Sequence, residues 1–177
     1  MTQPATQPQE VKQRKSYTRK TGSNPPGRPI AGLEEISFRK FNKEKDFVEY
    51  IILNIDNFCS VFLDEGIDFF KREYLINPIQ PFAKGPNQKV DLFIRTKSGK
   101  QYLVECKNPN NVIQEVNTGI VQCLSYLLEA ELVGLKIDGI FLLTTRLNPL
   151  SVGVIKRFNL PIQIWVLKET NFVGYKP

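Results

Sequence analysis

Asp91, Glu105 and Lys107 are the residues of this sequence whose types and spacing could do chemistry. Glu105 and Lys107 are separated by one residue, so on a β-strand their side chains project from the same face. Two carboxylates on neighbouring strands repel each other unless a cation lies between them. Such an all-oxygen site suits Mg²⁺ or Mn²⁺, and a nearby ammonium can stabilise a metal-activated water and the charge that grows on phosphorus. The combination suits hydrolysis of a phosphodiester.

Two short β-type runs carry these three residues. The first run, Val90–Thr96, contains the aspartate, and the second run, Gln101–Lys107, contains the glutamate and the lysine. Between them lies Lys97-Ser98-Gly99, the strongest hairpin signal in the chain. Whether the two carboxylates share a face therefore depends on the register of this hairpin.

The turn chemistry distinguishes two registers. A two-residue turn would place Asp91 opposite Cys106, on the wrong face, whereas a three-residue loop places Asp91 directly opposite Glu105. A loop of three residues favours a left-handed conformation at its third position, and the residue there is Gly99. We therefore predict the register that brings the two carboxylates side by side.

The rest of the chain supplies elements that must hold the hairpin in place. Apolar spacing predicts a first helix that is capped by Asn42 and carries Phe47, Val48, Ile51, Ile52, Ile55 and Phe58. The other expected elements are a strand near 72–79, a helix over 112–135, a strand over 138–145, a helix over 149–159 and a strand over 162–167. The order α-β-β-β-α-β-α-β predicts an α/β fold with a mixed sheet flanked by helices.

Asp91, a spacing of fourteen residues and then Glu105-Cys106-Lys107 resembles the PD-(D/E)xK nuclease superfamily. The restriction-endonuclease-like core of that superfamily has the same α-β-β-β-α-β order. Gln122 and Tyr126 in the following helix resemble the Gln-x-x-x-Tyr motif of RecB-type members. The stretch 44–167 looks most like the C-terminal nuclease domain of NucS-type stand-alone endonucleases.

The resemblance implies roles for the residues on the hairpin. Asp91, Glu105 and the backbone carbonyl of Cys106 would hold Mg²⁺ or Mn²⁺. Lys107 would assist the attacking water. Asp91, Glu105 and Lys107 would thus act as catalytic residues.

The resemblance also implies roles for residues on helices. Gln122 and Tyr126 lie one helical turn apart, on one face, and would lie near the scissile phosphate or brace the site. An acidic residue of the first helix often completes such a site. Glu44 is the candidate because it shares a face with the core stripe, whereas Glu49 points elsewhere on that helix.

The composition excludes several other chemistries. The chain has 177 residues and no histidine, which excludes Ser-His and Cys-His nucleophile pairs and histidine-ligated zinc or haem. Three widely spaced cysteines argue against a disulfide scaffold and fit a reducing compartment. Because the sequence shows no charged-then-apolar leader and no run of about 18 apolar residues, we expect a cytoplasmic protein without a membrane partner.

The positive charge gathers near the N-terminus. Residues 1–32 contain six bases and one acid, which leaves +5 of the formal net charge of +6. Because this segment has few large apolar residues, we expect a disordered arm ahead of a nuclease domain at 33–177. The arm would contact DNA phosphates, or would serve only as a solvated tail. Its basic residues are Lys12, Arg14, Lys15, Arg19, Lys20 and Arg28.

These observations favour a metal-dependent endodeoxyribonuclease of the repair, recombination or restriction type. A homodimer would pair two sites for two strands, although nothing in the sequence shows one. Structural interpretations stay open, because Asp91 and Glu105 could be ordinary edge-hairpin positions and Gln122 and Tyr126 a polar pair beside an apolar stripe. The alternative functions are a catalytically silent nucleic-acid-binding protein of the same fold and a nuclease that acts on RNA.

Overall fold

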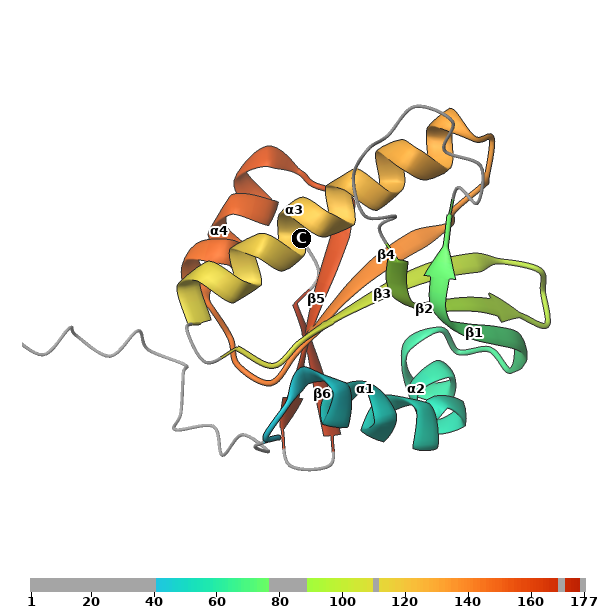
Figure 1. Ribbon diagram of the computed structural model, residues 1–177, viewed down its shortest axis with the longest axis horizontal. Helices are drawn as coiled ribbons and strands as arrows, with labels where there is room; N and C mark the ends of the chain where they lie inside the picture. Colours follow the sequence, from blue (N-terminus) through green and yellow to red (C-terminus); the bar gives the residue numbers. More distant parts are fainter. Residues whose placement is uncertain (1–40, 77–88, 110–111, 169–170, 176–177) are drawn as a thin grey trace, which may run out of the picture. The chain divides into compact units, whose positions relative to one another are not determined.

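The computed structural model describes residues 41–76, 89–109, 112–168 and 171–175. All of them belong to the unit Glu35–Pro177, and the arm predicted at 1–32 lies outside the described residues. The helices and strands (Figure 1) are α1 Glu44–Leu53, α2 Ile55–Phe62, β1 Ile67–Leu75, β2 Lys89–Thr96, β3 Gln101–Lys107, α3 Val112–Leu132, β4 Gly139–Thr144, α4 Pro149–Phe158, β5 Ile162–Lys168 and β6 Asn171–Tyr175.

The described strands form one six-stranded sheet in the order β1-β2-β3-β4-β5-β6. β2 is antiparallel to both β1 and β3, β4 is parallel to both β3 and β5, and β6 is antiparallel to β5. Parallel neighbours need crossover connections, which α3 and α4 provide. The predicted mixed sheet flanked by helices is therefore confirmed.

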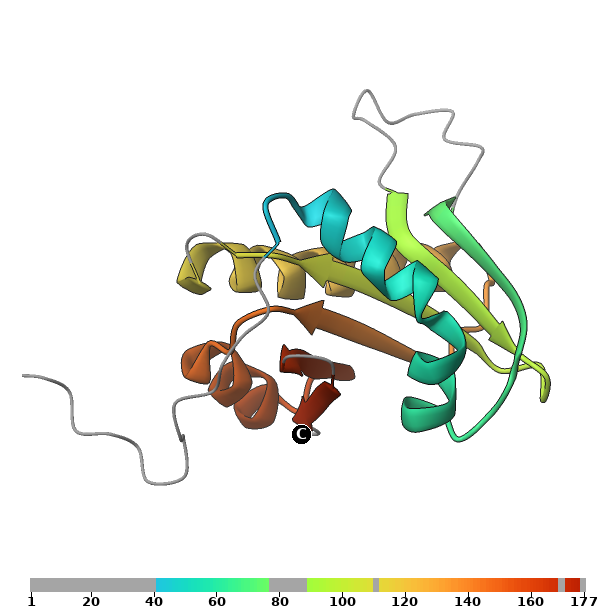
Figure 2. The same ribbon diagram turned by 90° about the horizontal axis from the view of Figure 1, so that it is seen from below.

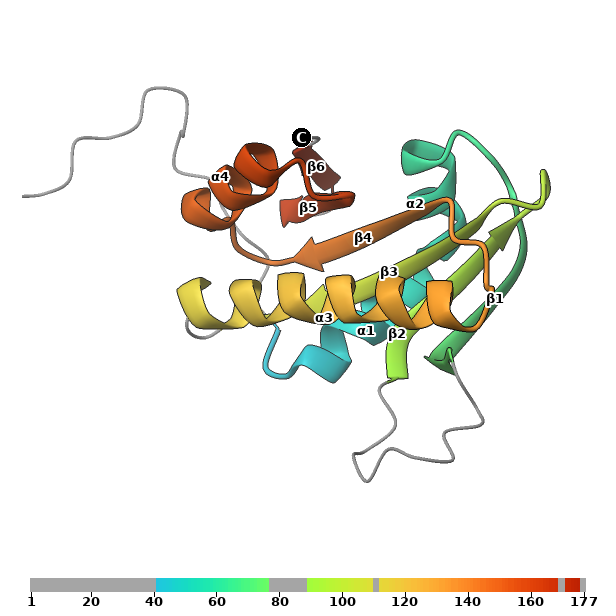
Figure 3. The same ribbon diagram turned by 90° about the horizontal axis from the view of Figure 1, so that it is seen from above.

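Helices cover both faces of this sheet, and each face has its own core. α3 and α4 lie on one face (Figure 3), where Ile120 and Ile155 are among the buried residues. α1 and α2 lie on the other face (Figure 2), where Phe47 and Phe58 are buried. None of the described helices is long and apolar enough to cross a membrane.

The first helix differs from the prediction in two ways. Lys43, not Asn42, occupies the cap position, and its N–H donates to Asp46 Oδ2 at 3.2 Å. The helix also breaks at Asn54, after which α2 begins. The Asn54 side-chain amide donates to the Tyr50 carbonyl at 2.8 Å. That carbonyl would accept the backbone N–H of Asn54 in a continuous helix, so the side chain competes with the helical bond.

The edge strands also differ from the prediction. β1 begins at Ile67 rather than near residue 72, and residues 77–79 of the predicted strand lie outside the described part of the chain. Most side chains of β1 are exposed, so its start has no apolar alternation that a sequence pattern could detect. β6 is a short edge strand that was not predicted. The fold thus has one helix and one strand more than the sequence indicated.

Candidate active site

The β2–β3 hairpin has the predicted three-residue loop. The Thr96 N–H donates to the Lys100 carbonyl and the Gly99 N–H donates to the Thr96 carbonyl, both at 2.9 Å. Gly99 has φ 85°, in the left-handed region. From the loop outward, the paired residues are Arg95 with Gln101, Ile94 with Tyr102, Phe93 with Leu103 and Leu92 with Val104. The predicted loop and the register of residues 92–95 are therefore confirmed, and Asp91 and Glu105 directly follow the last of these pairs.

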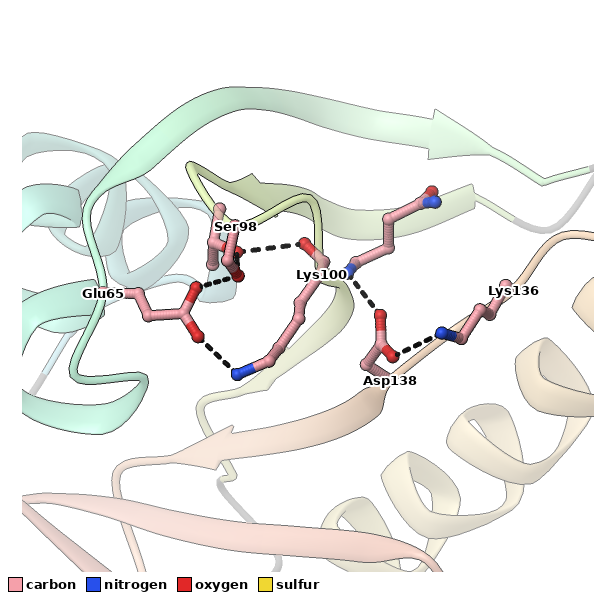
Figure 4. A network of polar contacts seen from close by, with 7 residues as sticks. Glu65, Ser98, Lys100, Lys136 and Asp138 are labelled. Carbon is pink, nitrogen blue, oxygen red and sulfur yellow. Dashed lines mark hydrogen bonds and ion pairs between the residues drawn. The ribbon is translucent and has the colours of Figure 1, made fainter.

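Polar contacts on both sides hold the loop end of this hairpin (Figure 4). Glu65, which precedes β1, pairs with Lys100 and accepts a hydrogen bond from Ser98. Asp138, which precedes β4, accepts the Gln101 N–H at 2.9 Å. The hairpin is therefore tied to the segments that lead into its neighbouring strands, and this fixes the position of its far end.

Asp91 is oriented by the backbone of the adjacent strand. Its Oδ2 atom accepts the Cys106 N–H at 2.8 Å, which holds the carboxylate against β3. The Cys106 side chain is fully buried in the core beneath α1 and α2. Burial raises the pKa of this thiol well above its ordinary value, so the sulfur is not a nucleophile. That the Cys106 carbonyl binds a metal stays a prediction.

Glu105 and Lys107 lie side by side, as their spacing predicts. Lys107 Nζ is 2.7 Å from Glu105 Oε1 and 3.2 Å from Glu44 Oε1. Glu105 and Lys107 are 2% and 8% exposed, whereas Glu44 lies at the exposed start of α1. One ammonium thus joins a buried carboxylate to one that reaches solvent. Glu44 therefore lies at the site, whereas Glu49 pairs with Arg72.

A glycine brings α3 close to this charged pair. A Cβ atom at Gly119 would lie 2.7 Å from Leu142 Cδ1 and 3.1 Å from Lys107 Cγ. Both distances are shorter than ordinary van der Waals contact, so a larger residue would displace its neighbours. Gly119 thus lets α3 pack directly against the aliphatic stem of Lys107. Sequence reasoning missed this residue, because a lone glycine in a helical pattern carries no information about what lies opposite.

The two residues predicted on α3 differ in what they contact. The Tyr126 hydroxyl lies 3.3 Å from Glu105 Oε2 and 3.1 Å from the Lys89 carbonyl oxygen, and it can donate to one of them at a time. Gln122 is half-buried one helical turn before Tyr126. Its Oε1 atom is buried and has no hydrogen-bond partner within the described ranges. Tyr126 therefore braces Glu105, and Gln122 retains an open acceptor.

Burial and mutual repulsion shift the pKa values of this cluster. Burial raises the pKa of Glu105 to about 7, and the Asp91 charge acts in the same direction. Burial also raises the pKa of Asp91, although the Cys106 N–H bond and the Lys107 charge oppose the shift. Burial alone would lower the pKa of Lys107, but Glu105, Glu44 and Asp91 together raise it. The lysine therefore stays positively charged, and its one charge does not fully offset the negative charges of the neighbouring carboxylates.

The carboxylate pair fits a hard divalent cation. With Asp91, Glu105 and Glu44 ionised, three negative charges surround Lys107, and the Arg72 charge also acts on Asp91. A divalent ion would offset the remaining charge. In the described part of the chain, no group of three or more His, Cys, Asp or Glu side chains is arranged to hold a metal. Mg²⁺, however, binds through one or two carboxylates and keeps several of its waters.

A cavity of about 250 Å³ opens beside Asp91. Its lining residues are Glu44, Lys45, Val48, Arg72, Glu73 and Asp91. Cationic and anionic side chains therefore meet at one opening, which could receive a phosphate together with its counter-ion. A larger cavity of about 770 Å³ lies at the C-terminal end of α3 and contains none of these residues.

Glu73 is a site residue that sequence reasoning missed. Its φ of 47° is unusual for a residue other than glycine. The cross-strand pairs on either side of it are Arg72 with Leu92 and Tyr74 with Val90. Glu73 therefore lies between these two pairs, and it lines the cavity beside Asp91. The sequence could not show this, because no short turn sets the register between β1 and β2.

Two solved structures are similar to this chain. The crystal structure of a repair endonuclease from Pyrococcus abyssi is 16% identical, with a TM-score of 0.47, and the match covers 73% of this chain and 49% of that one. An EndoMS–dsDNA complex is 16% identical, with a TM-score of 0.45, and the match covers 78% of this chain and 50% of that one. The chain thus spans about half the length of either structure. No family model and no curated protein matches the sequence.

Proposed function

We propose that this chain is a metal-dependent endonuclease that hydrolyses phosphodiester bonds of DNA. The observation that carries the proposal is the gathering of two carboxylates and a lysine at the end of the hairpin: Asp91 accepts the Cys106 N–H, its charge acts on Glu105, and Lys107 pairs with Glu105. Asp91, Glu105 and the Cys106 carbonyl would hold Mg²⁺ or Mn²⁺. The bound ion would activate a water and polarise the phosphodiester.

The neighbouring side chains have separate roles in this proposal. Lys107 stays protonated because of its raised pKa, so it offers a positive charge where negative charge grows on the phosphate. Tyr126 holds one oxygen of Glu105 in position. Glu44 holds the Lys107 ammonium from the solvent side. The open acceptor of Gln122 is available to a water or to the substrate.

Cleavage assays test the proposal with a matched pair of aspartates on neighbouring strands. Asp91→Asn removes a carboxylate of the site, whereas Asp68→Asn removes an exposed carboxylate of β1 that pairs with Arg95 at 2.8 Å. With Mg²⁺ and a panel of linear, supercoiled, branched and single-stranded DNA, we expect Asp91→Asn to lose at least about 100-fold in rate. Asp68→Asn should cleave like the wild type. Equal activity of the two variants would remove Asp91 from the mechanism.

Metal binding has a readout that does not depend on cleavage. An ion that binds only the folded chain raises the melting temperature, by an amount equivalent to about 2.7 kcal/mol at a hundredfold excess over its dissociation constant. We expect Mg²⁺ to stabilise the wild type and Asp68→Asn but not Asp91→Asn. If Mg²⁺ changes none of the three, a catalytically silent nucleic-acid-binding protein becomes the better interpretation.

The choice of DNA is supported by the resemblance of the Asp91 and Glu105-x-Lys107 pattern to PD-(D/E)xK nucleases. Matched DNA and RNA oligonucleotides test it directly, and cleavage of RNA alone would replace DNA as the substrate. The basic arm at 1–32 is proposed to bind backbone phosphates. Its deletion should then flatten the salt dependence of binding by about 0.9 in the logarithmic slope per lost phosphate contact. An unchanged slope would make the arm a solvated tail.

A further inference from the structure

α3 has a second apolar face that points away from the sheet. Val121, Leu124, Leu128 and Leu132 are exposed, with exposed fractions of 62% for Val121 and 78% for Leu132. Their spacings of three and four residues place them along one side of the helix. The core-facing side of α3 is different, because Val116, Ile120, Cys123 and Ala130 are buried there. A helix with only one covered apolar face would carry polar residues at these exposed positions.

α4 carries a matching exposed stripe. Leu150, Val154 and Phe158 follow one another at four-residue spacing and are all exposed. α3 and α4 cover the same face of the sheet (Figure 3), and the Ser151 hydroxyl of α4 donates to Asn117 Oδ1 of α3 at 2.8 Å.

This contact shows that the two stripes border each other. Asn117 lies four and seven residues before Val121 and Leu124, so the α3 stripe continues the row that faces α4. Ser151 lies three and seven residues before Val154 and Phe158, so the α4 stripe continues the row that faces α3. The two stripes form one surface, here called the α3–α4 surface, made of Val121, Leu124, Leu128, Leu132, Leu150, Val154 and Phe158.

The size of the α3–α4 surface matches a stable interface. The exposed parts of its seven side chains amount to roughly 700 Å², and a standard interface buries about 800 Å² per partner. The largest apolar patch on a typical monomer is only about 300–600 Å².

The charges along the two helices complement each other. The acidic residues of α3 are Glu115, Glu129 and Glu131, and this helix has no basic residue. α4 contains Lys156 and Arg157 and no acidic residue. Glu131 lies three residues after Leu128, and Arg157 lies three residues after Val154, so both border the apolar stripes. Both are exposed, and neither forms an ion pair within the described residues.

We propose that the α3–α4 surface is the interface of a homodimer in which α3 of each copy packs on α4 of the other. A two-fold axis presents the same patch on both copies. The acidic α3 of each copy therefore meets the basic α4 of the other, and this contact occurs twice in the dimer. An apolar surface that is bordered by acid on one helix and base on the other is complementary to itself. The proposal does not depend on the proposed cleavage reaction, because none of its residues holds the metal or touches Lys107.

The mass of the full chain in solution tests the proposal. We expect sedimentation to give twice the chain mass of 20.3 kDa across about 1–100 µM protein. Val121→Glu with Leu132→Glu should convert the dimer to a monomer. The matched control is Val61→Glu with Leu53→Glu, because Val61 and Leu53 are 62% and 83% exposed but lie on the other face of the sheet. The control should stay dimeric.

Two outcomes would overturn the proposal. A wild type that sediments at the monomer mass throughout this range would mean that another protein, or none, covers the surface. A dimer that survives the α3 double variant but not the control would place the interface on α1 and α2. Circular dichroism of each variant confirms that it is folded, which is expected because every substituted side chain is exposed.

Charge reversal tests the packing of α3 on α4. Arg157→Glu and Glu131→Arg should each weaken dimerisation about tenfold, because each places like charges together at two symmetric positions. The double variant should recover most of the wild-type affinity. If the double variant is weaker than either single variant, Glu131 and Arg157 do not face each other and the proposed packing is wrong.

Discussion

A lysine near each end of the β2–β3 hairpin pairs with a glutamate, but the two pairs have different surroundings. At the loop end, Glu65 pairs with Lys100, which is half exposed, and the bonds from Lys100 and Ser98 lower the pKa of Glu65 to about 2. At the far end, Glu105 pairs with Lys107, and burial raises the pKa of Glu105 to about 7.

The pKa of the glutamate is therefore shifted in opposite directions at the two ends. At the loop end the side chains of Lys100 and Glu65 are 51% and 19% exposed, and the bonds from Lys100 and Ser98 decide the direction of the shift. At the far end, desolvation and the neighbouring Asp91 outweigh the bond from the lysine. A partly exposed lysine–glutamate pair is thus a structural feature. A buried pair next to a second carboxylate has the perturbed pKa values that are typical of functional sites.

Removing each lysine should separate the two ends most strongly. Lys107→Met leaves Glu105 buried without its cation, so we expect cleavage to be lost and the free energy of unfolding to fall by about 3 kcal/mol near pH 8. Lys100→Met acts at an exposed pair and should change both quantities little. Denaturant unfolding and cleavage rates measure the contrast. Equal effects would show that burial does not distinguish the two pairs.

The pH dependence of unfolding should also differ between the two glutamates. Between pH 4.5 and about 7, folded Glu105 holds a proton that the unfolded chain releases, so stability in metal-free buffer falls as the pH rises. The loss is at most about 3 kcal/mol, and Glu105→Gln should flatten this region. Glu65 has a lowered pKa, so its contribution is present above pH 4.5 and is lost as the pH falls toward 2.

The control for this pH prediction is Glu65→Gln, which should flatten only the acidic limb of the curve. Thermal unfolding from pH 3 to pH 8 gives both regions in one series. A wild-type curve that rises between pH 4.5 and 7 and is insensitive to Glu105→Gln would contradict the raised pKa of Glu105.

Two helical glycines differ in how closely their surroundings pack against them. Gly119→Ala places a methyl group against Leu142 and the stem of Lys107, so we expect a loss of about 1–3 kcal/mol together with slower cleavage. Gly153→Ala in α4 meets nothing within 4 Å and should stabilise the fold by about 0.5–1 kcal/mol. Chemical denaturation of both variants measures the difference. If Gly119→Ala is also stabilising, α3 has room to shift and does not position Lys107.

The smallest expected difference concerns two tyrosines. Tyr126→Phe removes the hydroxyl that contacts Glu105 and the Lys89 carbonyl, so we expect a loss of about 0.5–1.5 kcal/mol and reduced cleavage. Tyr102→Phe, on β3 near the loop end, should be close to neutral. Comparing the unfolding midpoints and cleavage rates of the two variants tests whether Tyr126 supports Glu105.

Local chemistry explains which parts of the site were predictable. Gly99 sets the loop type, and the loop sets the register of the pairs that end at Leu92 and Val104, next to Asp91 and Glu105. The two-residue spacing of Glu105 and Lys107 places both on one face of β3. Each step involves residues close together in the chain, so sequence periodicity and turn chemistry were sufficient. Helical spacing also indicated Glu44, which reaches Lys107.

Other features depended on contacts between distant segments. Glu73 and Arg72 reach the cavity beside Asp91 because β1 pairs with β2, and no short turn sets that register. The break at Asn54 depends on a single side-chain hydrogen bond that competes with the helix. The need for glycine at position 119 depends on which side chains lie under α3. None of these leaves a periodic signal in the sequence.

By itself, the amino-acid sequence determined the order of the central elements, the hairpin register and the presence of two acids and a lysine that could meet. Only the tertiary structure decided that Glu105 and Lys107 are buried while Lys100 stays half exposed and Glu65 partly exposed, and this difference reverses the pKa shift of a glutamate. The reason is that residue type and spacing set which groups lie together along a strand, whereas the dielectric surroundings of those groups depend on helices that are distant in the chain.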